Sequence, residues 1–236
     1  MRAATFNIHH GVGLDGRLDL DRISATIESL RVDVIGLQEV DRQFAERSEF
    51  ADQARALSRR LDLRLAYGPA LDLDPARPGD PRRRYGNAIL ARHPIVGRGN
   101  ERLPRTAPVE QRALLRAQIE VGDRRLQVYA THLEAHDTGQ RALQAGAVAA
   151  AIAARPGPAL LLADLNARPD LPEMAAIGAV LVDGWRAGSG RGFTYPAAAP
   201  TKRIDVVLHT PVLRATAASV RPATGSDHRP VVVEFD

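Results

Sequence analysis

The residues of this chain that could do chemistry lie in short polar clusters beside apolar, strand-like runs. The clusters are Phe6-Asn7, Gln38-Glu39, Thr131-His132, Asp164-Leu165-Asn166, Arg203-Ile204-Asp205 and Ser226-Asp227-His228. Buried strands can deliver such side chains to one edge of a sheet. Carboxylate and amide oxygens suit a hard divalent cation, and imidazoles suit proton transfer. The set predicts a metal-assisted acid–base site of the kind that directs water in line at phosphorus.

Two of the clusters also have simpler interpretations. Glu39 follows the buried run 34–37, where a carboxylate is costly unless it is paired. Either a metal ion or a salt bridge to arginine would offset that cost. Asp164 and Asn166 lie two residues apart, so they share one face of an extended chain. The same Asp-x-Asn spacing is typical of a turn that ends a strand, so neither cluster decides the chemistry by itself.

The histidines and the later acidic residues offer acid–base roles. His228 can donate a hydrogen bond or a proton to an oxyanion, and Asp227 beside it can reach a metal. Asp205 begins a strand, from which it could orient an imidazole as the buried carboxylate of a catalytic triad does. His132 ends a strand, and a histidine in that position is commonly structural.

The pattern of the chain predicts a scaffold of buried strands that could position these side chains. Apolar or alternating runs predict strands at 3–8, 32–37, 63–67, 87–91, 114–121, 125–131, 160–163, 203–209, 212–220 and 230–235. Helical spacing predicts helices at 19–30, 51–61 and 138–154, with a short one at 171–177. No linker divides the chain and no convincing internal repeat is visible. We therefore expect one α/β domain over residues 1–236, built as a two-sheet sandwich.

The composition indicates a globular protein without disulfides. The chain has 236 residues, 44% of them hydrophobic, and no cysteine. We see neither the apolar segment of a signal peptide nor an apolar run long enough to span a bilayer. We expect a cytoplasmic monomer without a membrane anchor.

The net charge of +4 invites comparison with nucleic-acid-binding proteins. The basic residues are almost all arginine, however, with Lys202 as the single lysine, which indicates a compositional bias. The one dense cluster, Arg82-Arg83-Arg84, follows a Pro/Gly/Asp-rich loop and has no aromatic neighbour beyond Tyr85. A solvated loop is favoured over a nucleic-acid contact surface.

In their order along the chain, the clusters resemble the endonuclease/exonuclease/phosphatase superfamily, whose fold is that of DNase I. The resemblance runs from Thr5-Phe6-Asn7 to Asp227-His228-Arg229-Pro230, and Leu37-Gln38-Glu39 is among its most specific motifs. It implies a four-layer α/β sandwich, in which helices flank two packed mixed β-sheets. It also implies a phosphoester substrate and Mg²⁺ or Mn²⁺ as cofactor.

The resemblance implies a metal and water centre. Asn7 and Glu39 would lie near the metal, and Asp227 would be a ligand of the metal or of its water. Asp164 would activate the attacking water, and Asn166 would hold a phosphate oxygen. The family's usual Gly-Asp-Phe-Asn is Ala163-Asp164-Leu165-Asn166 here, so the chemical residues are kept.

The resemblance also implies groups that act on the phosphate. His228 would stabilise the pentacovalent phosphorane, with Asp205 fixing its tautomer. His132 resembles the second histidine of the DNase I and sphingomyelinase branches. Asn87 would support His132 or contact the phosphate, and Arg112 is a further candidate to hold the phosphate.

One motif marks a subgroup, and four loops are expected to set specificity. His9-His10-Gly11 resembles a bacterial subgroup of metal-dependent hydrolases, but we expect neither histidine to ligate the metal. Specificity is expected in loops 72–84, 106–111, 135–139 and 187–200.

Three functions fit this sequence. The first is a Mg²⁺-dependent phosphoesterase that hydrolyses a small or lipid-derived phosphodiester. The second is a DNA or RNA nuclease, which needs a continuous basic face. The third is a catalytically silent binding module on the same fold, which the intact polar clusters disfavour.

Overall fold

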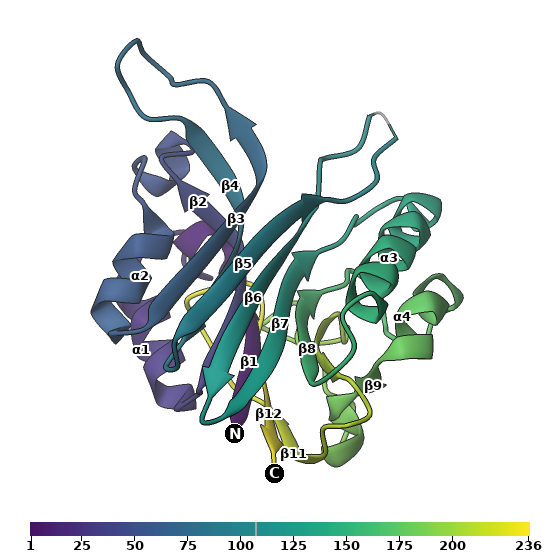
Figure 1. The fold of residues 1–236 in the computed structure, drawn as a ribbon. Helices are drawn as coiled ribbons and strands as arrows, with labels where there is room; N and C mark the ends of the chain where they lie inside the picture. The colour runs from purple at the N-terminus through teal and green to yellow at the C-terminus, as the bar shows by residue number, and fades with distance from the viewer. Residues whose placement is uncertain (107) are drawn as a thin grey trace.

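The first of two sheets uses strands from both ends of the chain. Its spatial order is β11 (Ala215–Val220), β12 (Val231–Phe235), β1 (Arg2–Asn7), β2 (Val34–Arg42), β4 (Arg83–Ala91) and β3 (Arg64–Leu73). β1 and β2 are parallel, and the other neighbours are antiparallel. Two helices, α1 (Leu20–Leu30) and α2 (Gln53–Leu61), cover its outer face (Figure 1). The computed structural model describes residues 1–106 and 108–236, so Ala107 in the expected specificity loop 106–111 lies outside the described residues.

The second sheet comes from the middle of the chain. Its spatial order is β5 (Ile95–Arg102), β6 (Ala113–Val121), β7 (Arg124–His132), β8 (Ala159–Asp164), β10 (Asp205–His209) and β9 (Val182–Asp183). Here β7 and β8 are the parallel pair. The helices α3 (Thr138–Ala153) and α4 (Ala175–Val180) cover its outer face (Figure 1). Short 3₁₀ turns are η1 (His9–Gly11), η2 (Glu46–Ser48), η3 (Pro172–Met174) and η4 (Gly184–Ala187).

Apolar cores hold the four layers together. Side chains such as Val128, Leu160 and Val233 fill the space between the sheets. Ile27 of α1 belongs to a core under one outer layer, and Ile152 of α3 to a core under the other. The expected four-layer α/β sandwich of two mixed sheets is confirmed. Among the described residues, no helix has both the length and the apolar character needed to cross a membrane.

The two sheets come close together where the polar clusters gather. Gly36 of β2 lies so near β8 that an added Cβ would come within 2.6 Å of the Leu162 Cβ. Gln38 donates from Nε2 to the Leu162 carbonyl at 3.1 Å, which links β2 to β8. The carboxyl ends of parallel strands from both sheets thus meet. In Figure 1 this end lies away from the two chain termini, and the β3–β4 hairpin projects beside it.

Two strands were not predicted, the two-residue β9 and the longer β5. β5 contains Gly97, Arg98, Gly99 and Asn100, and exposed residues alternate with half-buried ones along it. As an edge strand it needs little apolar character, because one neighbour satisfies one side of its backbone and water the other. Its polar composition therefore concealed it.

Candidate active site

Asp164 lies at the centre of the gathered side chains. It ends β8 and its exposed fraction is 0%. Its Oδ2 accepts a hydrogen bond from Asn7 Nδ2 at 3.0 Å and lies 3.5 Å from His132 Nε2 and 3.8 Å from His228 Nε2. Its Oδ1 accepts the Asn166 backbone N–H at 2.9 Å. This last hydrogen bond forms the turn that the Asp-x-Asn spacing predicts. Asp164 therefore both ends its strand in a turn and lies among the other site residues.

Asn166 fixes the tautomer of His132. Asn166 adopts a left-handed φ of 52°, a conformation that asparagine tolerates better than most residues. Its Nδ2 donates to the Leu133 carbonyl at 3.0 Å and lies 2.8 Å from His132 Nε2. Because that amide nitrogen can only donate, His132 Nε2 must accept, and the ring proton is on Nδ1. His132 Nδ1 has no hydrogen-bond partner among the described residues.

His228 forms an ion pair with a buried carboxylate. Its Nδ1 lies 2.9 Å from Asp205 Oδ2, and its ring centroid lies 4.7 Å from that of Tyr195. Burial works to lower the pKa of His228, but the charges of Asp205 and Asp164 outweigh burial and raise that pKa to about 10. Its other nitrogen, Nε2, faces Asp164. His228 is therefore a cation at neutral pH and points toward the central carboxylate.

A bulge in β2 directs Glu39 into the site. Leu37 pairs with Ala88 and Val40 with Gly86, so two residues of β2 oppose Asn87 alone. Glu39 is one of those two and has a left-handed φ of 57°, a strained conformation for a non-glycine residue. A bulge re-aims a side chain in this way. The predicted strand stopped at residue 37, whereas β2 continues through the bulge to Arg42.

The bulge brings Glu39 to the same amide as Asp164. Asn7 Nδ2 donates to Glu39 Oε1 at 3.0 Å as well as to Asp164. Burial works to raise the pKa of Glu39, but contact with the His10 imidazole and the Asn7 amide outweighs burial and holds that pKa below its usual range. Glu39 is therefore a buried, ionised carboxylate.

The His9-His10 motif packs against the two other predicted metal residues. His10 Nδ1 lies 3.6 Å from Glu39 Oε2, and His9 Nδ1 lies 3.8 Å from Asp227 Oδ1. Both histidines have left-handed φ values, 46° and 42°. His9 also donates its backbone N–H to Asn7 Oδ1 at 3.0 Å. The motif thus forms one wall of the site.

Ser226 joins the last cluster to β1. Its hydroxyl donates to the Asn7 carbonyl at 2.7 Å, and it accepts the His228 backbone N–H at 3.1 Å. Asp227 lies between them, with Oδ1 4.0 Å from His228 Nε2. The sequence interpretation assigned no role to Ser226, although its place in the motif was the signal.

Arg112 and Asn87 lie on the other side of His132. They line a small cavity that Glu39 and His132 also line. Arg112 is 8% exposed, pairs with Glu110 at 2.9 Å, and its Nε has no partner among the described residues. Burial and the Arg112 charge together hold the pKa of His132 well below its usual range. Asn87 donates to the Ala113 carbonyl at 3.1 Å, and its expected support of His132 stays a prediction.

The oxygen-rich donor set fits a divalent metal. Ligand atoms of Asp164, Asp205 and His228 lie within 4.8 Å of one another, and the Asn7 amide nitrogen links Asp164 to the Glu39 carboxylate. Carboxylate and amide oxygens are the ligands that Mg²⁺ and Mn²⁺ take in proteins. The described residues could therefore hold such an ion.

The triple-arginine cluster is largely neutralised. Arg82 binds Asp72 at 2.6 Å and Asp74 at 2.8 Å, and Arg84 lies 3.3 Å from Asp72. Arg83 donates to the Asp74 carbonyl. These contacts join the cluster to the aspartates of the β3–β4 hairpin, and its interpretation as a solvated loop stays a prediction.

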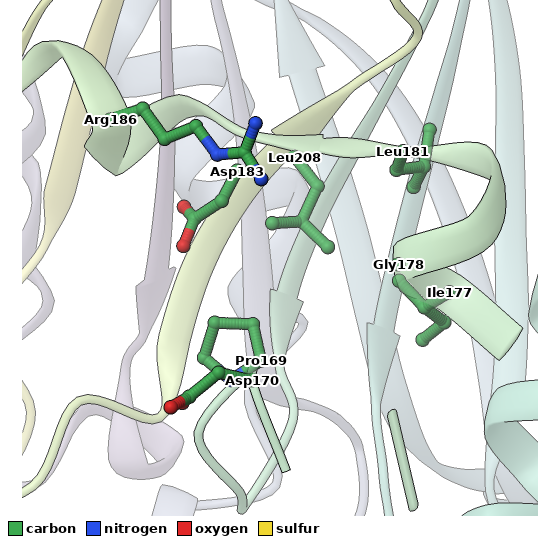
Figure 2. A pocket seen from close by; sticks show the side chains of 8 residues that line it. All are labelled: Pro169, Asp170, Ile177, Gly178, Leu181, Asp183, Arg186 and Leu208. Carbon is green, nitrogen blue, oxygen red and sulfur yellow. The ribbon is translucent and has the colours of Figure 1, made fainter. Parts of the chain in front are cut away.

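A separate cavity lies beside α4 and β9. It has a volume of about 230 Å³, and its charged lining includes Asp170, Asp183 and Arg186 (Figure 2). Asp183 already binds Arg203 at 2.7 Å, and Asp170 binds Arg168. Both carboxylates are satisfied, and none of the candidate site residues lines this cavity.

Comparison with known proteins agrees with this architecture. The sequence profile of the Endonuclease/Exonuclease/phosphatase family matches residues 4–228. The chain belongs to this family. Members of the family are hydrolases that act on phosphoester bonds, and they are typically metal-dependent. A search of curated proteins finds no match.

Several solved structures share the fold. An endonuclease/exonuclease/phosphatase from Beutenbergia cavernae is 28% identical, with a TM-score of 0.82 over 100% of this chain and 71% of that one. A mannosyl-6-phosphatase from Bacteroides thetaiotaomicron is 18% identical, with a TM-score of 0.76 over 100% and 99% of the two chains. Truncated TDP2 from Caenorhabditis elegans is 20% identical, with a TM-score of 0.71 over 99% and 96%. The resemblance found in the sequence is confirmed.

Proposed function

We propose that this chain is a Mg²⁺- or Mn²⁺-dependent phosphoesterase that hydrolyses a small or lipid-derived phosphodiester by in-line attack of water. The observation that carries the proposal is the set of contacts around Asp164. The side-chain amide of Asn7, the backbone N–H of Asn166 and two imidazoles surround this one buried carboxylate; the imidazoles belong to His132 and His228.

Asp164 is suited to accept a proton from water. Burial and the neighbouring Asp205 raise the pKa of Asp164 to about 7, against the opposing charge of His228. A base whose pKa lies near the working pH transfers protons efficiently. His228 supplies the complementary group, because its pairing with Asp205 keeps it charged. That charge would stabilise the negative charge that develops on the phosphoryl oxygens.

Asn7, Glu39 and Asp227 would hold the metal. His228 is less suited to ligation, because an imidazolium has no free lone pair. When bound, the metal supplies positive charge that polarises a phosphoryl oxygen. Holding the remaining oxygens would fall to His132 and Arg112, with Asn87 beside Arg112. Asn166 would join them only by releasing one of its two amide hydrogen bonds, to Leu133 or to His132.

The paired arginines of the β3–β4 hairpin disfavour the nuclease alternative. A nuclease gains affinity by releasing counterions from DNA phosphates, which requires unpaired basic side chains along a face. Arg82 and Arg84 are already paired with aspartates. A compact phosphoester fits the site better than a polymer.

A hydrolysis screen tests the proposal. The purified chain is incubated with Mg²⁺, Mn²⁺ or EDTA and offered bis(p-nitrophenyl) phosphate, choline phospholipids, phosphomonoesters, plasmid DNA and abasic DNA. We expect metal-dependent, EDTA-sensitive cleavage of a small or lipid diester that exceeds cleavage of DNA. Efficient plasmid nicking at physiological salt would instead favour the nuclease. Absence of any hydrolysis together with absence of metal binding would favour the silent module.

A further inference from the structure

A cavity of about 740 Å³ opens beside the candidate active site. Residues 108–110 and 134–138 line it, together with Arg112. Arg112 also lines the small cavity that contains Glu39 and His132. The guanidinium therefore borders both spaces, and a phosphate held near His132 would direct the rest of its molecule into the larger cavity.

Hydrogen-bond donors and acceptors are mixed along the wall of this cavity. The carboxylates of Glu110, Glu134 and Asp137 are acceptors, whereas the Arg112 guanidinium can only donate. Arg112 has a buried Nε without a partner among the described residues. His136 and the Thr138 hydroxyl can each donate or accept. This mixture suits hydroxyl groups, which do both.

Glu134 is a fixed acceptor in this wall. Its exposed fraction is 4%, and its Oε1 accepts the His136 backbone N–H at 3.0 Å. Its own backbone is tied to α3, because its N–H donates to Gln144 and its carbonyl accepts from Arg141 Nη1, each at 2.8 Å. A side chain held in this way can discriminate between ligands better than one on a mobile loop.

We propose that this cavity binds the alcohol portion of the substrate, and that this alcohol carries several hydroxyl groups, as a sugar or other polyol does. The inference rests on the proposed phosphoesterase function and narrows its substrate class. A charge-assisted hydrogen bond between a hydroxyl and a carboxylate is among the stronger polar contacts. A ligand without hydroxyls would instead displace water from the buried Glu134 and Arg112 side chains without replacing its hydrogen bonds, which is costly.

The same wall disfavours the other substrate classes. No Phe, Tyr or Trp lines the described part of the cavity, so a nucleobase would have only the imidazole of His136 to stack on. The three carboxylates would repel a polyphosphate backbone. Among the described residues, the apolar lining is limited to Pro108, Val109 and Ala135, too little to hold an acyl chain.

A matched pair of leaving groups tests the proposal. Glucose 6-phosphate and n-hexyl phosphate have equal numbers of carbon atoms but differ in hydroxyl groups, and each is offered as the monoester and as its methyl diester. We expect kcat/KM to be at least ~10-fold higher for the glucosyl ester, the lower end of what one charged hydrogen bond gives. The ratio of the two values should fall at least ~10-fold in Glu134→Gln and in Glu110→Gln.

Two controls separate folding and chemistry from recognition. Glu120→Gln removes a half-exposed carboxylate of β6 that does not line the cavity, and it should keep the wild-type ratio. Circular dichroism checks that Glu134→Gln is folded. Glu110→Gln is the second carboxylate variant, at a side chain that is 41% exposed and pairs with Arg112; because both esters carry the same phosphate, an effect through Arg112 cancels in the ratio.

The outcomes distinguish this inference from the proposed function. Hydrolysis of p-nitrophenyl esters combined with equal rates on the glucosyl and hexyl esters would overturn the polyol inference alone. If no ester were hydrolysed, the proposed function would be at fault. The cavity would then be tested by calorimetric titration with glucose 6-phosphate and n-hexyl phosphate. Tighter binding of the sugar ester, lost in Glu134→Gln, would support the inference, and equal affinities would overturn it.

Discussion

The two sheets have the same pattern of parallel and antiparallel strand pairs but present different groups at matching positions. In each sheet, one parallel pair lies between antiparallel neighbours, in the same spatial order. Asn7 is paired with Gln38 in one sheet, as His132 is paired with Asp164 in the other. Extending the register across each sheet matches Asn7 with His132, Gln38 with Asp164, Asn87 with Asp205, and His228 with Arg112.

The matched cations show what this difference means. Val231 of β12 and Leu115 of β6 occupy equivalent register positions in the two sheets. His228 lies three residues before Val231, and Arg112 lies three residues before Leu115. An arginine is charged at any working pH. Arg112 therefore needs no carboxylate at the matching position, and the neutral amide of Asn87 occupies it. A histidine needs a carboxylate to remain charged above neutral pH, and Asp205 occupies that position beside His228. The fold thus provides one permanent and one titratable cation.

The largest effect is expected from removing the titratable cation or the base that it faces. His228→Ala and Asp164→Ala should each lower kcat by ~10²–10⁴-fold, because each removes a positioned proton-transfer or charge-stabilising group. Steady-state kinetics on the substrate found by the screen provides the measurement. Near-normal kcat in either variant would contradict the assignment.

The double variant checks that the two residues act together. Groups that serve one transition state give effects far smaller than the product of the single effects. A fully multiplicative loss would mean that His228 and Asp164 act in separate steps. Circular dichroism should show all three variants folded.

The second effect concerns the metal. Glu39→Ala should weaken Mg²⁺ or Mn²⁺ binding by at least ~10-fold, because a hard cation depends on carboxylate ligands. Calorimetry on the metal-free chain measures this directly. Glu46→Ala is a suitable control, since Glu46 is exposed in the nearby η2 turn. Unchanged affinity in Glu39→Ala would place the metal elsewhere.

Much of this arrangement could be predicted from the sequence, because it follows from strand ends. Asn7, His132 and Asp164 each end a strand with a clear apolar run, so their convergence follows from the sheet. The motif beginning at Ser226 was equally visible. The four-layer fold was implied by the order of these motifs.

The other parts of the site depend on long-range contacts, which the local sequence pattern does not contain. The β2 bulge that turns Glu39 inward is a long-range register shift against β4. The match between the two sheets was hidden, because one half is assembled from both chain ends. Tyr195 approaches His228 from a loop with irregular structure. No periodicity predicts these contacts.

A third effect is the pH dependence of stability, which His228 should cause and Arg112 should not. In the unfolded chain the imidazole titrates near ~6.5, whereas folding raises the pKa of His228 to about 10. A raised histidine pKa contributes stability in full below the unfolded pKa, and that contribution is lost as pH rises through the folded pKa. Between pH ~7 and ~10, the wild-type chain should lose up to ~1.4 kcal/mol per pH unit from this group.

Asp205→Asn removes the cause of that shift. Urea unfolding of the metal-free protein across this pH range should therefore give a shallower decline in the variant. The range starts at pH ~7 because the raised pKa of Asp164, about 7, adds a decline of the same sign below it, and Asp205 contributes to that shift as well. Parallel stability curves for the variant and the wild type would show that Asp205 does not hold the proton on His228.

The smallest effect is expected from the arginines outside the matched positions. Arg82 carries the same charge as Arg112, but its side chain is 44% exposed and is shared between Asp72 and Asp74. Exposed ion pairs contribute ~0–1 kcal/mol, so Arg82→Ala should change the free energy of unfolding by no more than that. It should also leave kcat/KM for the preferred ester within about twofold, since no phosphate contact is lost. A loss of plasmid binding at physiological salt in this variant would show instead that the hairpin contacts a polyanion. Arg82 would then contribute to binding a long, polymeric substrate, and the contrast between Arg82 and Arg112 would not follow from their positions on the two sheets.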